Sequence, residues 1–182
     1  GATLTMNDSD ALGNASLVVS SNFAFGNTTT FNFGGANATN RTALITGSNA
    51  VWAVITNLNI GNNGGVSNTA TVANGGQIRA ITAGLPISII VGNNAFSNAL
   101  VMATDGILSN INLTIGNGNS GSNALVMAGG TLWAASLRAT NAGNRVIFNS
   151  GSLNSSSTFI SNQVFTVGNG TTVGIFSGLK IG

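Results

Sequence analysis

The stretch Leu113-Thr114-Ile115-Gly116-Asn117 alternates apolar and polar residues and then ends on a Gly-Asn pair. Alternation over a short run is typical of a half-buried β-strand, and Gly and Asn tolerate the positive φ that tight turns need. Related phrases recur along the 182-residue chain, at 4–7, 31–34, 58–62, 89–93, 113–117, 137–141 and 165–169. Their fourth residues fall at 7, 34, 61, 92, 116, 140 and 168, which are 24–31 residues apart. A period in this range predicts a solenoid.

Each repeat contains two more segments that resemble strands. The second segments are 17–19, 43–45, 70–72, 100–102, 125–127 and 146–148. The third segments begin at Val51, Ile78, Leu108, Leu132 and Leu153. Three strands in each repeat predict an all-β parallel β-helix (β-solenoid) of about six to seven coils, formed by one domain over residues 1–182.

Stacked parallel coils would place equivalent residues above one another, about 4.8 Å apart. The apolar positions of the phrase would then form inward columns that supply the core. The asparagines at its corner would form a column in which amide groups bond from coil to coil. This predicted column contains Asn62, Asn93, Asn117, Asn141 and Asn169.

The composition provides few groups for catalysis. Only 4% of the residues are charged, and the chain has no His, Cys or Glu. Triads that need His or Cys are impossible, and acid–base chemistry has few candidate residues. We therefore expect a non-enzymatic protein without a metal or cofactor. The basic residues form no run, which argues against nucleic acid as a partner, and no apolar stretch is long enough to span a membrane as a helix.

Two longer segments resemble a known family. The stretches LTIGNGNSGSNALVMAGGTL (113–132) and NRVIFNSGSLNSSSTFISNQVFTVGNGTT (144–172) are similar to the repeats of bacterial autotransporter-associated β-strand proteins. Similar repeats occur in large secreted proteins with PEP-CTERM-type anchors. The resemblance implies a right-handed solenoid, export, and a structural role outside the cell or on the bacterial surface. It carries no catalytic residue over to this chain.

The third strands suggest a candidate contact surface. Trp52 and Trp133 each follow the first apolar residue of a third strand, and Arg79 holds the same place in a coil between them. In this frame the three side chains form an outward column that could stack on sugar rings or on a neighbouring filament. Alternatively, the frame slips by one residue and both tryptophans fill the core.

The two ends of the chain resemble strands and carry no obvious cap. An uncapped solenoid can stack end to end into a filament. The residues expected at such a joint are Leu4, Met6, Asp8, Asp10, Leu179, Lys180 and Ile181. Alternatively, Asp8 and Asp10 form an ordinary polar corner, and the chain is a slice of a longer solenoid.

The leading hypothesis is therefore a structural extracellular or cell-surface protein whose partner is another copy of itself. The second hypothesis is an adhesin stalk, or a stalk segment that binds an extracellular polysaccharide.

Overall fold

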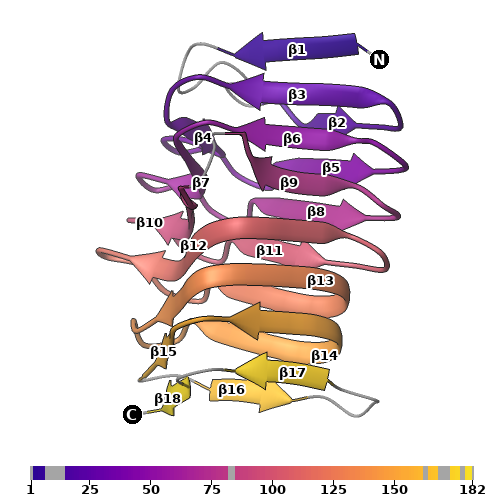
Figure 1. The fold of residues 1–182 in the computed structure, drawn as a ribbon. Helices are drawn as coiled ribbons and strands as arrows, with labels where there is room; N and C mark the ends of the chain where they lie inside the picture. Colours follow the sequence, from indigo (N-terminus) through magenta and orange to yellow (C-terminus); the bar gives the residue numbers. More distant parts are fainter. Residues whose placement is uncertain are drawn as a thin grey trace.

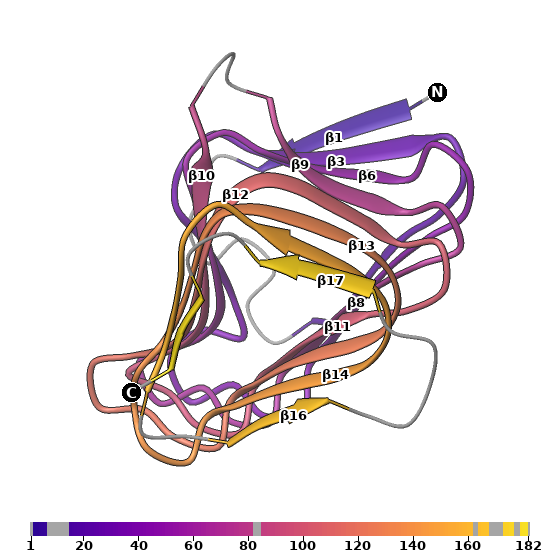
Figure 2. The same ribbon diagram turned by 60° about the horizontal axis from the view of Figure 1, so that its bottom comes forward.

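The computed structural model describes side chains over residues 15–81 and 85–161, and the backbone alone over 2–6, 164–167, 173–176 and 179–181. The fold is all-β, and the described residues contain no helix. Parallel strands stack into a β-solenoid (Figure 1). The strands form three faces around a common axis (Figure 2). The solenoid predicted from the repeat is thus confirmed.

Face 1 contains the strands of the opening phrase. Along the axis they are β4 (Phe31–Phe33), β7 (Asn57–Asn62), β10 (Ile87–Asn93), the second half of β12 (Ile107–Asn117), the end of β13 (Ala124–Ala139), β15 (Thr158–Ile160) and β18 (Leu179–Ile181). All neighbours are parallel. The register aligns Phe31, Leu58, Ile89, Leu113 and Leu137 in one buried column, as the phrase predicts.

Face 2 contains the second strands. They are β2 (Leu17–Val19), β5 (Thr42–Thr46), β8 (Thr69–Ala73), β11 (Ala99–Met102), the start of β13, the first half of β14 (Arg145–Ser155) and β16 (Val164–Val167). The six second segments expected from the sequence are all paired in the expected register.

Face 3 contains the third strands. They are β1 (Ala2–Met6), β3 (Phe23–Asn27), β6 (Val51–Val54), β9 (Gln77–Ala80), the start of β12, the middle of β13, the end of β14 and β17 (Val173–Phe176). Here too every pair is parallel.

The core fills the inside of the coils with side chains from all three faces. In the middle coils the inward residues are similar in size, as in the set Ile78, Ile89 and Leu100, which are all fully buried. Near the N-terminal end large and small residues share a coil: Trp52 from face 3 accompanies Ala70 from face 2. Because protein interiors are close-packed, a large side chain on one face requires a small one on another.

The first and last copies of the phrase do not lie on face 1. Leu4 pairs with Phe25 on face 3, and Phe165 pairs with Val146 on face 2. The position expected for Phe165 is taken by Thr158, which follows Leu137 by only 21 residues. The coils shorten at the C-terminal end, so the spacing of 24–31 residues does not continue. The predicted columns are therefore wrong at that end.

Candidate functional site

Trp52 belongs to the core, as the alternative with a slipped frame predicts, so its place in an outward column is wrong. Its side chain is fully buried and makes edge-to-face contacts with three phenylalanines. The ring centroids are 5.4 Å from Phe25, 5.8 Å from Phe31 and 6.2 Å from Phe33. Such contacts between aromatic rings stabilise a core beyond simple burial. The cluster cannot contact a glycan or a neighbouring filament.

The register explains the error. Thr46 pairs with Ala73, but the next pair is Val51 with Gln77, so the corner before β6 has one residue more than the corner before β9. Trp52 therefore pairs with Ile78, and Arg79 pairs with Ala53. Successive side chains of a strand point alternately to the inside and the outside of the solenoid. One extra residue in the preceding corner therefore moves Trp52 from the outside to the inside.

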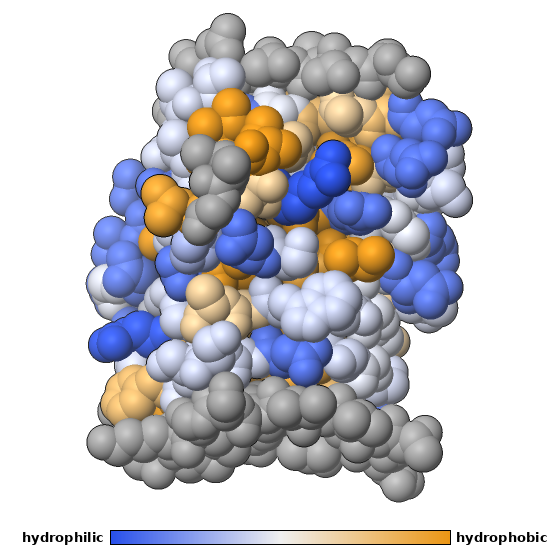
Figure 3. Space-filling view, in the orientation of Figure 1, coloured by the Kyte–Doolittle hydropathy of each residue, from blue (hydrophilic) through white to orange (hydrophobic). Residues whose placement is uncertain are grey.

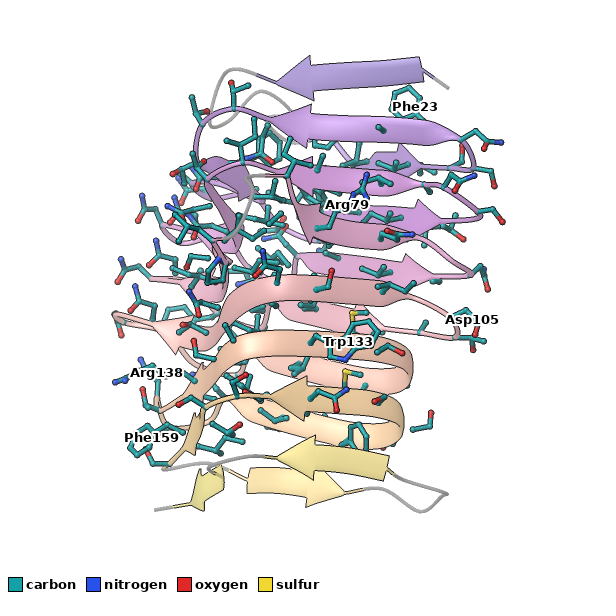
Figure 4. The ribbon with its side chains drawn as sticks, viewed as in Figure 1. Phe23, Arg79, Asp105, Trp133, Arg138 and Phe159 are labelled. Carbon is teal, nitrogen blue, oxygen red and sulfur yellow. The ribbon has the colours of Figure 1, made fainter. Side chains whose placement is uncertain are left out.

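Arg79 and Trp133 do share an outward column on face 3. Arg79 pairs with Ser109, Ser109 pairs with Trp133, and Trp133 pairs with Asn154. Trp133 is 49% exposed, and Arg79 is exposed as well. Both project from the same side of the solenoid in Figure 4, and the view of Figure 3 from the same direction shows a surface that mixes polar and apolar residues. Two of the three residues of the predicted column are thus outward.

A hollow of about 360 Å³ lies beside Trp133, at the corner between face 3 and face 1. Its lining consists of Asn110, Trp133, Ala134, Ala135, Asn154, Ser155 and Ser156. The pairing of β12 with β13 shifts register at this corner, between Ser109 and Ile111 and again before Asn112. Asn110 at the first shift has a φ of 56°. The hollow therefore lies where the regular ladder is interrupted.

Three of the predicted corner asparagines form the expected column, which we call the surface ladder. Asn93 Nδ2 donates to Asn62 Oδ1 at 2.8 Å, and Asn117 Nδ2 donates to Asn93 Oδ1 at 2.8 Å. Asn141 departs from the pattern, because its Nδ2 donates to Gly118 O at 2.6 Å and to Ser120 Oγ at 3.2 Å. Asn169 lies outside the described residues.

A second column of asparagines, which we call the internal ladder, was not predicted. It consists of the fully buried Asn68, Asn98, Asn123 and Asn144. The side-chain oxygen Oδ1 of Asn98 accepts hydrogen bonds from both the backbone N–H and the Nδ2 of Asn68, at 3.0 Å each. The same two bonds join Asn98 to Asn123, and Asn123 to Asn144, at 2.9–3.1 Å. Buried amides need such partners, so these bonds satisfy groups that water cannot reach.

The internal ladder explains the glycine of the phrase. Gly92 has a φ of 80°, and a Cβ atom at this position would overlap the side chain of Asn123 in the following coil. The same arrangement joins Gly34 to Asn68, Gly61 to Asn98 and Gly116 to Asn144. Both the backbone conformation and the close approach of the amide exclude other residues at these positions.

The residues expected at an end-to-end joint lie at opposite ends of the solenoid (Figure 1). Leu4 and Met6 are in β1, while Leu179, Lys180 and Ile181 are in β18. The structure describes the backbone of both strands but not their side chains. Asp8 and Asp10 lie outside the described residues, so their place at the joint stays a prediction.

No group of three or more acidic, His or Cys residues that could hold a metal lies among the described residues. That same part of the chain has no helix long and apolar enough to cross a membrane. No protein-family model, curated protein or solved structure matches this chain.

Proposed function

We propose that this chain is a structural protein, a stiff solenoid whose stacking continues beyond its own ends. The observation that carries this proposal is the state of the terminal strands. Among the described residues, β1 pairs only with β3, β2 only with β5 and β4 only with β7, while β16 and β17 pair only with β14 and β18 pairs only with β15. Each of these strands thus has one edge without a strand partner in the described part of the chain.

The sequences of these terminal strands favour association. They read ATLTM, LVV and FNF at the N-terminal end and VFTV, VGIF and LKI at the C-terminal end, and their only charged residue is Lys180. Natural proteins usually protect an open strand edge with charges, proline or a covering segment. A parallel strand from a second copy would extend the three faces. Because this contact is between different surfaces, it would produce a filament rather than a closed dimer.

We further propose that the solenoid is right-handed with six to seven coils, that it is non-enzymatic, and that it acts outside the cell or on a bacterial surface. The resemblance to autotransporter-associated repeats and the small number of groups for acid–base chemistry support these proposals. The glycan-binding hypothesis loses Trp52 but keeps Arg79 and Trp133, and the hollow beside Trp133 favours it as a second candidate function.

Electron microscopy and analytical ultracentrifugation of the purified chain test the filament. Thr3→Lys with Thr5→Lys places two charges on the edge strand β1, whereas Thr28→Lys with Thr29→Lys adds the same charge to an exposed segment after β3. We expect fibres from the wild type and from the second variant, and shorter or no assemblies from the first. A chain that stays monomeric at high concentration would refute end-to-end stacking.

A further inference from the structure

Trp133 is an exposed aromatic residue with a lined hollow beside it. Its indole is 49% exposed on β13, while the other tryptophan of the chain is fully buried in the core. The adjoining hollow, of about 360 Å³, lies at the small end of the usual range for ligand pockets, about 300–1,000 Å³. A single ring of a small ligand fits a space of this size.

The lining has a distinct chemistry. Ala134 and Ala135 are small, so the space next to the indole stays open. The polar residues of the lining are Asn110, Asn154, Ser155 and Ser156, and none of the lining side chains is charged. The Ser155 hydroxyl donates to Ser157 O at 2.7 Å, so towards a ligand it could only accept. Amides and hydroxyls both donate and accept hydrogen bonds.

The two amides are held in place by other parts of the fold. Asn110 Nδ2 donates to Leu85 O at 3.2 Å, and Asn154 Nδ2 donates to Ser152 Oγ at 2.9 Å. These bonds fix the direction in which each amide carbonyl points. A binding site gains precision when its polar groups are held by neighbours in this way.

We infer that the hollow beside Trp133 is a binding site for a neutral saccharide. The apolar face of a pyranose ring would stack on the indole, and its hydroxyls would bond to the amides and hydroxyls of the lining. A neutral sugar fits better than an acidic one, because the nearest cation of this column, Arg79, is two coils away, about 10 Å at the spacing of parallel strands.

The column gives the ligand a direction. Ser109, Trp133 and Asn154 are successive rungs along the axis, so a linear polysaccharide parallel to the axis would contact one rung after another. This inference is independent of end-to-end stacking, because face 3 stays on the outside of a filament.

Titration with cellohexaose and chitohexaose, followed by tryptophan fluorescence and calorimetry, tests the site. Hexagalacturonate serves as the acidic counterpart. Trp133→Ala removes the stacking surface, while Ala135→Leu fills the hollow and keeps the indole. Phe96→Ala is the matched control, since Phe96 is also an exposed aromatic (40%) but lies away from the hollow. Unchanged thermal melting shows that each variant is folded.

We expect one of the neutral hexasaccharides to bind, with at least tenfold weaker binding in Trp133→Ala and in Ala135→Leu and unchanged binding in Phe96→Ala. The inference is overturned if neither neutral sugar binds, or if Trp133→Ala binds as well as the wild type. It is also overturned if only hexagalacturonate binds, or if Trp133→Ala changes lateral association of the solenoids and not sugar binding.

Discussion

Replacing Asn98 by alanine removes the centre of the internal ladder and should destabilise the fold well beyond a surface substitution. The side-chain oxygen Oδ1 of Asn98 accepts two hydrogen bonds from Asn68. The Nδ2 of Asn98 donates to Asn123 Oδ1 at 3.1 Å, Gly65 O at 3.1 Å and Phe96 O at 3.0 Å. All of this lies in a fully buried side chain, so water does not replace the lost partners.

The magnitude follows from which groups lose their partner. The backbone N–H of Asn68 loses its acceptor, and an unsatisfied buried donor costs about 1–3 kcal/mol. The Asn68 amide keeps its bond to Ala38 O at 3.2 Å, and Asn123 Oδ1 keeps the backbone N–H of Asn98 at 2.9 Å. The cavity that the missing amide group leaves in the core adds about 1 kcal/mol to the loss of stability. Together these give a loss of about 2–4 kcal/mol in the free energy of unfolding.

Urea unfolding followed by circular dichroism measures this loss, with Asn93→Ala as the matched control. Asn93 also bonds to two asparagines, but in the surface ladder, where water can replace the lost partners. We expect a cost of about 0.5–1.5 kcal/mol for the control. Equal costs for the two variants would refute the distinction between the ladders.

Asn98→Asp adds a pH test of the same reasoning. Burial and the surrounding carbonyl oxygens disfavour the charged form, so the pKa of the new carboxyl rises in the folded state above its unfolded value. Only the protonated carboxyl can donate a bond. The variant should therefore be most stable at low pH and lose stability relative to wild type as the pH rises above about 4, the ordinary pKa of an aspartate.

Other substitutions test the core and the ends of the internal ladder by thermal unfolding. Trp52→Ala should lower the free energy of unfolding by about 3–5 kcal/mol, and a variant as stable as the wild type would contradict the core position of Trp52. Trp52→Phe should lower it less, because the buried indole N–H has no hydrogen-bond partner in the described structure that could be lost. Arg41 precedes Asn68 in the column of the internal ladder, because its backbone N–H donates to Asn68 Oδ1, and its buried Nε has no partner in the described structure. Arg41→Asn should therefore raise the free energy of unfolding by about 1 kcal/mol, and a lower melting temperature would refute this position for an added ladder asparagine. Gly92→Ala should cost at least about 1–2 kcal/mol for its positive φ, and adding Asn123→Ala should cost less than the sum of the two single changes; strict additivity would exclude their contact.

Most of the fold could be predicted because the repeat is visible in the residues themselves. The columns of faces 1 and 2 follow from apolar positions that recur with their spacing. The same reasoning failed for Trp52, because nothing in its own strand shows that the preceding corner has an extra residue. A signal was nevertheless present: Ala43 and Ala70 are the small inward residues of face 2, so the coils that contain them need a large side chain from another face.

The internal ladder also left a signal that periodicity in apolar residues does not reveal. Ser67, Ser97 and Ser122 each precede a ladder asparagine, and each has a φ between 57° and 58°. A Ser-Asn pair that recurs just before the second strand is thus the mark of a left-handed residue followed by a buried amide. Polar residues before a strand are easily taken for an ordinary surface loop, which is why these pairs were missed.

The internal ladder gives the solenoid a polarity. Asn68, Asn98 and Asn123 each donate the backbone N–H and an Nδ2 bond to the Oδ1 of the asparagine in the next coil, and the ladder ends at Asn144, whose N–H and Nδ2 donate to Asn141 O. Asn98 and Asn123 therefore each need a correctly placed asparagine on both sides, and every ladder asparagine fills the space that the glycine of the preceding coil leaves open. Such nearest-neighbour dependence makes the addition of one coil to a formed stack more favourable than the formation of a coil alone.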